Sequence, residues 1–173
     1  MSKFKPTKYY KNIFEVNYPL LKEQGIKLIA CDLDNTLVPH DVKEPDWHVI
    51  DLFKELKAMN FIVIILSNNN EKRVSTFCTQ LVVPYYYSAK KPLKRTFKKI
   101  LKDYHLTSEQ VCLIGDQILT DVYGANRMNM MNILVEPLAH RDIIYTKINR
   151  FFEKIIIKSL TKRKLFKKGE YYE

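Results

Sequence analysis

Short, continuous apolar runs alternate along this chain with longer segments in which apolar residues recur every three or four positions. The continuous runs predict one strand that begins near Ile26 and further strands over residues 61–66, 85–87, 111–114 and 132–135. The periodic segments predict helices over residues 46–59, 71–80, 93–104 and 120–128. The chain therefore alternates between strand and helix over most of its length.

This alternation predicts an α/β fold, in which a mainly parallel, doubly wound sheet lies between two layers of helices. Phe53 and Leu56 fall on one side of their predicted helix, as Phe97 and Ile100 do on theirs, so we assign both pairs to the hydrophobic core rather than to a cofactor site. The chain has 173 residues, four glycines and no internal repeat or flexible linker. We expect a single domain over residues 1–173.

The predicted strand that begins near Ile26 ends in two aspartates. Asp32 and Asp34 lie two residues apart, so on an extended segment they share a face. They stand at the carboxyl end of the strand, where open parallel sheets bind ligands. Two carboxylates this close repel each other unless a cation, a shared proton or strong hydrogen bonds offset the charge, and a hard divalent ion such as Mg²⁺ fits best. Taken alone, the segment is also compatible with an Asx-rich turn.

Three further predicted strands lead into polar residues of the kinds that a phosphate-handling site needs. They supply a hydroxyl group and amides, a compact cation for an anionic intermediate, and two more carboxylates. Each of these turns alone resembles an ordinary solvated loop, but their order and their shared place after strands favour one site. The residues are Ser67 and Asn68 after residues 61–66, Lys90 and Lys91 after residues 85–87, and Asp116 and Asp121 after residues 111–114.

With these motifs in this order, residues 26–135 resemble the haloacid dehalogenase-like (HAD) phosphohydrolases. The resemblance implies a Rossmann-like core and Mg²⁺-dependent hydrolysis of a phosphomonoester through an aspartyl phosphate. Asp32 would be the nucleophile, Asp34 would protonate the leaving oxygen and then activate water, and Thr36 would brace the motif. A carboxylate can attack a phosphate dianion only where cations offset their repulsion, which agrees with the implied metal and lysine.

The same resemblance implies roles for the residues that would bind the phosphoryl group. Ser67 would bind the group during transfer, and Asn68 would help to orient it. A lysine would neutralise the charge of the phosphoryl group, and Lys91, directly before proline, fits the family pattern better than Lys90.

The resemblance also implies the ligands of the Mg²⁺ ion. They would be the Asp32 carboxylate, the main-chain carbonyl of Asp34, and Asp116. Asp121 would support the ion or the lysine from outside this shell, although the roles of Asp116 and Asp121 could be exchanged.

Within the HAD group, the chain is most similar to the IIIA-type, YqeG-like branch, judged from residues 31–38, 66–69, 91–92 and 115–127. This branch is similar to phosphatases that convert phosphatidylglycerophosphate to phosphatidylglycerol, so the resemblance implies a lipid phosphate as substrate. His40, in a flap over the site, and Arg127, opposite an anionic head group, are further candidates for substrate contact. An incidental surface histidine and a structural arginine are the alternatives.

The intervals between the motifs are too short for an inserted cap domain. A loop, a helix and a strand fill the interval from Asp34 to Ser67, and a helix and a strand fill that from Ser67 to Lys91. A capless site cannot enclose a small metabolite. It excludes water through the substrate itself, a partner or a surface such as a bilayer, which favours bulky substrates.

Composition places the protein in a reducing compartment. The chain is 46% hydrophobic and 28% charged, enough for a globular core. Cys31, Cys78 and Cys112 lie in apolar segments without metal-ligand spacing, so we expect small buried residues rather than disulfides. The amino terminus lacks an apolar signal core, and no apolar run is long enough to span a bilayer. We expect a cytoplasmic protein that is either free or peripheral at the inner face of the membrane.

The basic carboxyl-terminal tail, over about residues 141–173, contains most of the net charge of +10. Residues 147–168 hold nine Lys or Arg residues against Glu153 alone. Phe151, Phe152 and Ile155 belong to an apolar helical stripe beside this charge, as in helices that lie at a membrane interface. A terminal helix docked on the sheet, with a solvated basic face, is an equally good interpretation.

Two other functions remain open at this stage. One is a soluble phosphatase that acts on a sugar, nucleotide or protein phosphate. The other is a basic adaptor that binds ribosomal RNA or another partner. The intact set of carboxylates argues against this function, because an adaptor does not need them. Nucleic-acid binding is the weaker explanation of the basic tail because no base-reading module accompanies it. The sequence predicts no oligomeric state.

Overall fold

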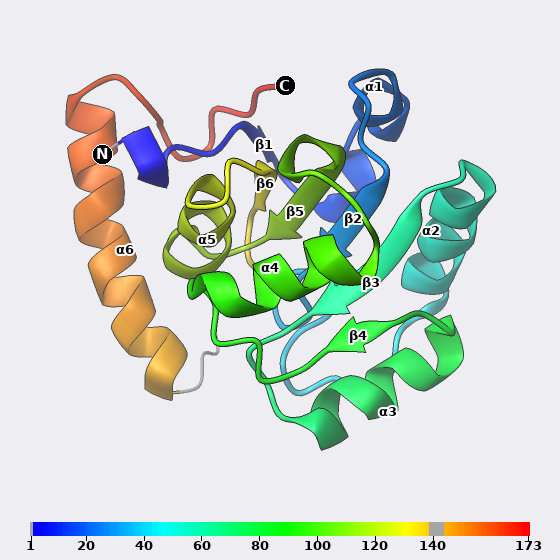
Figure 1. Ribbon diagram of the computed structural model, residues 1–173. Helices are drawn as coiled ribbons and strands as arrows, with labels where there is room; N and C mark the ends of the chain where they lie inside the picture. Colours follow the sequence, from blue (N-terminus) through cyan, green and yellow to red (C-terminus); the bar gives the residue numbers. More distant parts are fainter. Residues whose placement is uncertain (1, 139–143) are drawn as a thin grey trace.

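Six parallel strands form one sheet in the computed structural model, which describes residues 2–138 and 144–173 with the side chains of 144–150 excepted (Figure 1). Their order across the sheet is β1-β6-β5-β2-β3-β4. The strands are β1 (Lys8–Tyr10), β2 (Leu28–Cys31), β3 (Ile62–Leu66), β4 (Tyr85–Tyr86), β5 (Val111–Gly115) and β6 (Met131–Val135). The parallel α/β fold expected from the sequence is confirmed.

Helices follow the strands along the chain. They are α1 (Tyr18–Glu23), α2 (Trp47–Ala58), α3 (Glu71–Leu81), α4 (Lys94–Asp103), α5 (Tyr123–Asn126) and α6 (Ile144–Lys162), with short 3-10 helices at Ser2–Phe4, Ile13–Glu15 and Ser108–Gln110. The predicted helices over 46–59, 71–80 and 93–104 match α2, α3 and α4 to within one residue at each end. Asp46 and Asn70 begin α2 and α3 by accepting the N–H groups of Val49 and Arg73.

Alternate residues of the central strands face opposite layers, as strand geometry requires. In β2, Ile29 and Cys31 pack in a core with α2 and α3. Leu28 and Ala30 pack in a second core with α4. The sheet is therefore covered on both faces, which explains why its strands read as continuous apolar runs rather than as alternating ones.

One strand, one α-helix and the three short 3-10 helices were not predicted, and one prediction is wrong in its bounds. Strand β1 pairs with β6, and its Tyr9 forms a two-way backbone bridge with Tyr172 near the end of the chain. Helix α1 was also missed. The helix expected over 120–128 begins earlier, as a π-helical turn at Ile118–Val122, and continues as α5.

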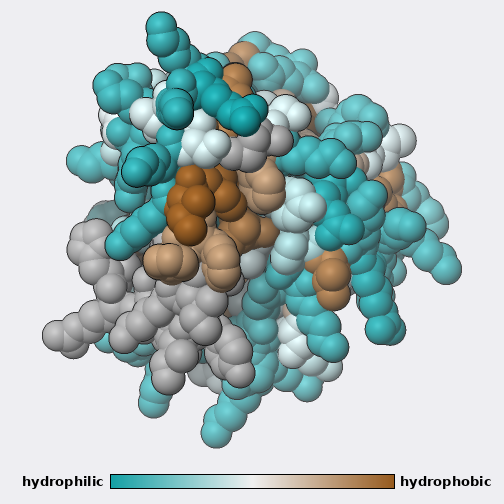
Figure 2. Space-filling model, turned by 90° about the vertical axis from the view of Figure 1, so that its left-hand side faces the viewer, coloured by the Kyte–Doolittle hydropathy of each residue, from teal (hydrophilic) through white to brown (hydrophobic). Residues whose placement is uncertain are grey.

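Helix α6 packs at the β1 side of the sheet, against the π-helical turn at Ile118–Val122 (Figure 1). Leu160 is buried against Tyr9, and the Glu153 carboxylate accepts the N–H of Leu119 at 3.2 Å. Docking is incomplete, because Phe151 and Phe152 remain 63% and 51% exposed. Figure 2 faces this side of the molecule and shows an apolar patch with hydrophilic residues above it and to either side. Helix α6 is therefore docked on the fold, as one of the two sequence interpretations expected, and part of its apolar stripe stays exposed.

The segment between β2 and α2, residues 32–46, is a loop without an inserted domain. The catalytic edge of the sheet, by which we mean the edge where the strands have their carboxyl ends, therefore has no cap between these elements. Within the part of the chain that the structure describes, no helix combines the length and apolar character needed to cross a membrane.

Candidate active site

A cavity of about 310 Å³ opens at the catalytic edge, and most of the predicted site residues line it. Asp32, Ser67 and Asp116 come directly after β2, β3 and β5, and parallel strands bring these positions together. The lining residues are Asp32, Asp34, Asn35, His40, Ser67, Asn68, Asn69, Lys91, Gln117 and Thr120.

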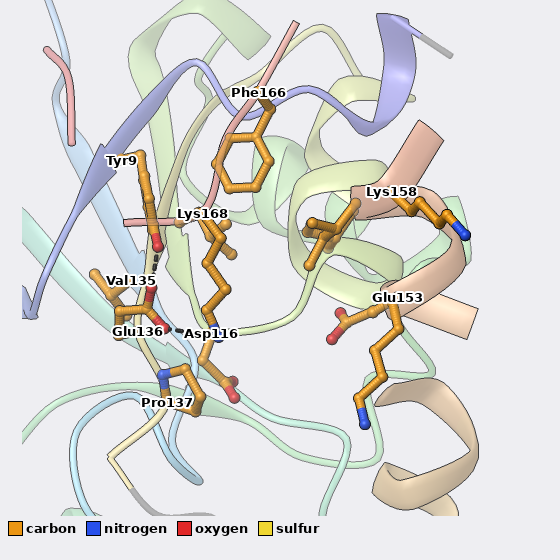
Figure 3. Close-up of a pocket in the computed structure, with 13 residues that line it drawn as sticks. Tyr9, Asp116, Val135, Glu136, Pro137, Glu153, Lys158, Phe166 and Lys168 are labelled. Carbon is orange, nitrogen blue, oxygen red and sulfur yellow. Dashed lines mark hydrogen bonds and ion pairs between the residues drawn. The ribbon is translucent and has the colours of Figure 1, made fainter. Parts of the chain in front are cut away.

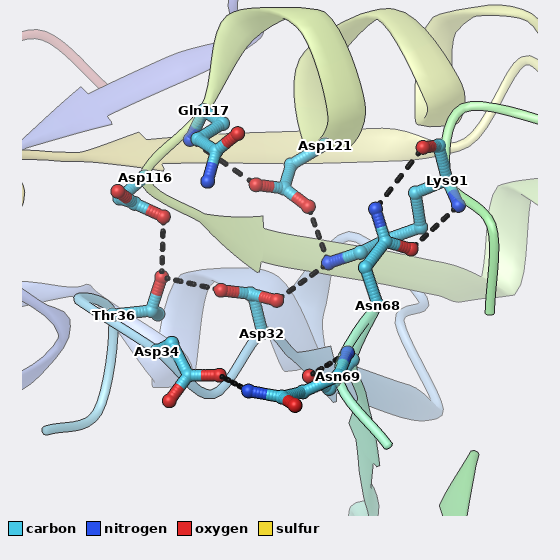
Figure 4. Close-up of polar contacts among 10 residues, drawn as sticks. Asp32, Asp34, Thr36, Asn68, Asn69, Lys91, Asp116, Gln117 and Asp121 are labelled. Atoms are coloured by element: carbon cyan, nitrogen blue, oxygen red, sulfur yellow. Dashed lines mark hydrogen bonds and ion pairs between the residues drawn. The ribbon is translucent and has the colours of Figure 1, made fainter. Parts of the chain in front are cut away.

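The ammonium group of Lys91 lies at the centre of the buried charges (Figure 4). Its Nζ is 2.6 Å from Oδ1 of Asp32 and 2.6 Å from Oδ1 of Asp121. The Lys91 side chain is 2% exposed. Lys90 is exposed, and its backbone has a φ of 53°, in the left-handed region. Of the two candidate lysines, the structure brings Lys91 to the site.

Burial and charge act in opposite directions on this ion pair. Burial disfavours the Lys91 ammonium, but the Asp121 and Asp32 carboxylates outweigh it and raise the pKa of Lys91, so the lysine stays charged. Burial raises the pKa of Asp32 to about 7 although Lys91 opposes the rise, and the carboxylates of Asp121 and Asp34 add to it. A second cation beside Asp32 would favour its ionised form.

Thr36 lies between two buried carboxylates. Its Oγ1 is 3.4 Å from Oδ2 of Asp32 and 3.3 Å from Oδ1 of Asp116, and one hydroxyl proton can satisfy only one of them at a time. Carboxylate oxygens of Asp32, Asp116 and Asp121 lie within 4.8 Å of one another, and all three residues are buried. A hard divalent cation with oxygen ligands fits this donor set, because it offsets the repulsion that burial strengthens.

Asp121 is held in place by its surroundings. Its Oδ1 accepts a hydrogen bond from Nζ of Lys91, and its Oδ2 accepts the N–H of Gln117 at 3.1 Å. The absence of a side chain at Gly115 makes room for it, since a Cβ there would lie 2.3 Å from Cγ of Asp121. Asp121 therefore contacts the lysine directly, while Asp116 faces Thr36, and this geometry favours Asp116 over Asp121 as the metal ligand.

The side chain of Asp34 is fixed by Arg73 and Asn69, neither of which was among the predicted site residues. Arg73 places Nε and Nη2 at 3.1 and 2.9 Å from Oδ1, and Asn69 donates from Nδ2 to Oδ2 at 3.1 Å. Arg73 also donates from Nη1 to the carbonyl of Lys43, in the loop between β2 and α2. The acid/base candidate and the adjacent loop are thus held by one residue of α3.

Asn68 and Ser67 organise the backbone around the cavity. The Asn68 amide accepts the N–H of Lys91 at 2.7 Å and donates to its carbonyl at 3.1 Å, so it clamps the lysine main chain. Ser67 is buried, and its Oγ accepts the N–H of Asn69 at 3.1 Å. Both side chains line the cavity, but Asn68 reaches the lysine rather than open space.

The two remaining candidates for substrate contact behave differently. His40 lines the cavity, and its Nδ1 is buried without a hydrogen-bond partner among the described residues. Arg127 donates from Nη1 to the carbonyl of Pro92 at 2.9 Å and lies over the ring of Tyr123, so the structure does not bring it into the cavity. The structural interpretation of Arg127 is the one that its contacts support.

A second cavity, of about 520 Å³, lies between the end of β6 and helix α6 (Figure 3). Asp116 and Glu153 line it together with the apolar side chains of Tyr9 and Phe166. Glu136 accepts the Tyr9 hydroxyl and pairs with Lys168 at 3.1 Å, so the carboxyl-terminal tail forms one wall. This cavity therefore adjoins the candidate metal site on the side away from Lys91.

A parallel α/β sheet with a buried lysine and three carboxylates at the carboxyl ends of its strands is the arrangement expected of a phosphoryl-transfer enzyme, in which cations offset the charge of the reacting anion. Comparison with known proteins identifies the family to which the chain belongs. Residues 88–142 match the model of the HAD-hydrolase-like family. The chain is 42% identical over 160 residues to the probable phosphatase YqeG of Bacillus subtilis, covering 92% of this chain and 93% of that protein.

The chain belongs to the HAD superfamily, and it is a HAD-type phosphatase. It is also 22% identical over 141 residues to phosphatidylglycerophosphate phosphatase 1 of Arabidopsis thaliana, covering 76% of this chain and 40% of that protein. Among solved structures, the cobalt-bound deoxy-D-mannose-octulosonate 8-phosphate phosphatase of Haemophilus influenzae superimposes with a TM-score of 0.52 at 16% identity. That likeness covers 84% of this chain and 95% of the other and shows a shared fold.

Proposed function

We propose that this phosphatase is a Mg²⁺-dependent phosphomonoester hydrolase that works through an aspartyl phosphate. The observation that carries the proposal is the contact of buried Lys91 with Asp32, 2.6 Å apart, beside a cluster of carboxylates that suits a divalent ion. Asp32 and Asp116, with the main-chain carbonyl of Asp34, would hold Mg²⁺. The ion would supply positive charge beside the phosphoryl group.

Each protein group has one task in the proposed reaction. Asp32 attacks phosphorus, and Lys91 neutralises charge on the transferring group. Asp34 gives a proton to the leaving oxygen and later takes one from water. Ser67 binds the phosphoryl group. Asn68, which clamps the main chain of Lys91, orients that group through the lysine it positions.

We further propose that the substrate is a lipid phosphate, with phosphatidylglycerophosphate as the leading candidate. Three observations support this proposal. The loop of residues 32–46 carries no cap, and α6 exposes an apolar patch. The Arabidopsis relative is named as a phosphatase of this lipid. Exposed Lys154 and Lys158 flank that patch and are complementary to an anionic leaflet. The enzyme would then be peripheral at the inner, cytoplasmic face of the membrane.

Phosphate release from a panel of substrates tests the reaction and the substrate together. The panel contains phosphatidylglycerophosphate in vesicles, sugar phosphates, nucleotides and an aryl phosphate, each with Mg²⁺ and with EDTA. We expect the vesicle-borne lipid to have the highest kcat/KM, EDTA to abolish turnover, and Asp32→Asn to be folded but inactive. Full activity of a folded Asp32→Asn protein would refute the mechanism. A clear preference for a sugar or nucleotide phosphate would identify a soluble phosphatase instead.

The role of α6 needs point substitutions rather than deletion of the tail. Leu160 and Phe166 are buried, so removing the segment would expose the core. Phe152→Ser changes an exposed residue of the patch and should weaken hydrolysis of vesicle-borne lipid while sparing the aryl phosphate. Equal loss on both substrates would argue against a membrane role for α6.

A further inference from the structure

The loop that carries Lys91 also exposes apolar side chains. Tyr87 and Leu93 are 43% and 53% exposed, and they flank the buried lysine in the connection from β4 to α4. This connection leaves the carboxyl end of β4, so it belongs to the catalytic edge of the sheet. We call residues 87–95, which are this connection and the first two residues of α4, the lysine loop.

The lysine loop has a uniformly positive charge. Lys90, Lys94 and Arg95 are all exposed, and residues 87–95 contain no acidic residue. None of the three cations forms an ion pair with a carboxylate among the described residues, in contrast to Lys99 further along α4, which pairs with Asp103 at 2.7 Å. Unpaired cations around an exposed leucine combine apolar and electrostatic attraction to a surface that is both apolar and anionic.

We propose that the lysine loop docks on an anionic lipid bilayer and turns the open active site toward it. This inference rests on the proposed lipid substrate and names the face of the enzyme that meets the membrane. Contact through α6 alone would hold the protein at the surface without directing the catalytic edge. A second contact beside Lys91 fixes that orientation, because the same loop carries the catalytic lysine and the docking residues.

An anionic bilayer fits the loop better than a nucleic acid does. Tyr87 offers a ring on which a base could stack, but Leu93 is the more exposed of the two side chains and has no such surface. The Leu93 side chain loses apolar area from water when it enters the interface. The cations surround Leu93 in sequence, so that Lys90 and Lys94 can remain at the head groups while the leucine passes below them.

Single-tryptophan variants locate the face that meets the bilayer. Trp47 is the only tryptophan, so Trp47→Phe gives a silent background. Into this background we would place Leu93→Trp in the lysine loop or Phe152→Trp on α6. The control is Val82→Trp, at the end of α3 and just before the amino end of β4, where Val82 is 80% exposed. Each protein is mixed with vesicles of phosphatidylcholine and phosphatidylglycerol, with and without brominated acyl chains that quench tryptophan.

We expect a blue shift and strong quenching for Leu93→Trp and Phe152→Trp, and neither for Val82→Trp. Quenching of Phe152→Trp without quenching of Leu93→Trp would overturn the inference, because the protein would then lie on the bilayer by α6 alone. A lack of quenching in all three variants would overturn it as well, and so would an emission change of Leu93→Trp with single-stranded RNA in place of vesicles.

A matched pair of charge variants tests the electrostatic part. Lys90→Gln with Lys94→Gln removes two cations from the lysine loop, and Lys98→Gln with Lys102→Gln removes two exposed cations from later turns of α4. The first pair should weaken vesicle binding roughly 30-fold, as expected for two basic residues near an anionic leaflet. The second pair should bind as the wild type does, and equal losses would contradict the proposal.

Both pairs should keep their activity on the aryl phosphate, which separates docking from catalysis. Failure of the substrate proposal would appear as absent hydrolysis of lipid phosphate by a protein whose lysine loop is still quenched. Failure of the docking proposal would appear as efficient lipid hydrolysis by a protein whose lysine loop is not.

Discussion

Two nitrogens of Arg73 share one oxygen of Asp34, at 3.1 Å from Nε and 2.9 Å from Nη2. The two side chains are only 12% and 19% exposed, so water screens this contact weakly. Asn70 begins α3 by accepting the N–H of Arg73, which places the arginine in the first turn of the helix at the catalytic edge. Arg73 thereby fixes the rotamer of the proposed acid/base group.

We predict that Arg73→Gln reduces kcat on an aryl phosphate by roughly 10- to 100-fold with little change in KM, because a misplaced Asp34 affects the chemical step and not the phosphate contacts. Steady-state kinetics with a circular dichroism check of the fold measures this. Lys72→Gln removes the same charge from the neighbouring, exposed position of α3 and should be neutral. Similar kinetics for the two variants would show that Asp34 does not depend on Arg73.

Gly115 offers a steric test of the Asp121 position. Gly115→Ala would place a methyl group 2.3 Å from Cγ and 2.4 Å from Oδ2 of Asp121, closer than any real Cβ contact. We expect a lower Tm and loss of activity, because Asp121 cannot move without leaving Lys91. Adding Asp121→Ala removes part of the clash and should recover some Tm but no activity. An active Gly115→Ala enzyme would mean that the Lys91–Asp121 contact is dispensable.

The sequence predicted the polar groups that follow strands, because parallel strands bring their carboxyl ends to one edge whatever the details of packing. Asp32, Ser67, Lys91 and Asp116 are all of this kind. Arg73 is different, since a charged residue in a helix usually indicates a solvated face. Its function depends on how the first turn of α3 meets the loop after β2, and the Asn70 cap was the one local signal for where that turn begins.

The edge of the sheet was missed for a related reason. Strand β1 has three residues, too few to show a period, and its place is determined by partners far away in the sequence. Tyr9 pairs with Leu134 in β6 and, through its backbone, with Tyr172. These contacts join both ends of the chain to the fold, and no local pattern around Tyr9 announces them.

This junction predicts that the carboxyl-terminal segment stabilises the whole fold. Phe166 is 4% exposed and packs edge-on against Tyr9, with ring centroids 5.0 Å apart. Phe166→Ala should lower the free energy of unfolding by about 3 kcal/mol, as for other buried phenylalanines. Phe152→Ala, at an exposed position of α6, should change it by less than about 0.5 kcal/mol. Urea denaturation measures both, and equal effects would contradict the docked tail.

The raised pKa of Asp32 predicts how stability depends on pH in the presence of EDTA. Burial raises this pKa from 3.8 to about 7. Between these values the unfolded chain has released the proton while the folded protein still holds it, so the folded state binds more protons and stability falls as pH rises. The loss amounts to at most about 1.4 kcal/mol per pH unit and ends once the pH passes the folded pKa.

Asp32→Asn removes the titrating group and should therefore flatten the stability curve between about pH 4 and pH 7. Denaturant titrations of wild type and variant at several pH values, all in EDTA, measure the difference between their unfolding free energies. Excess Mg²⁺ should stabilise the wild type more than the variant, because the variant lacks one carboxylate that would bind the ion. If the two curves run parallel, ionisation of Asp32 is not opposed by its burial. The Lys91 ammonium would then completely offset both the desolvation of Asp32 and its repulsion from Asp121.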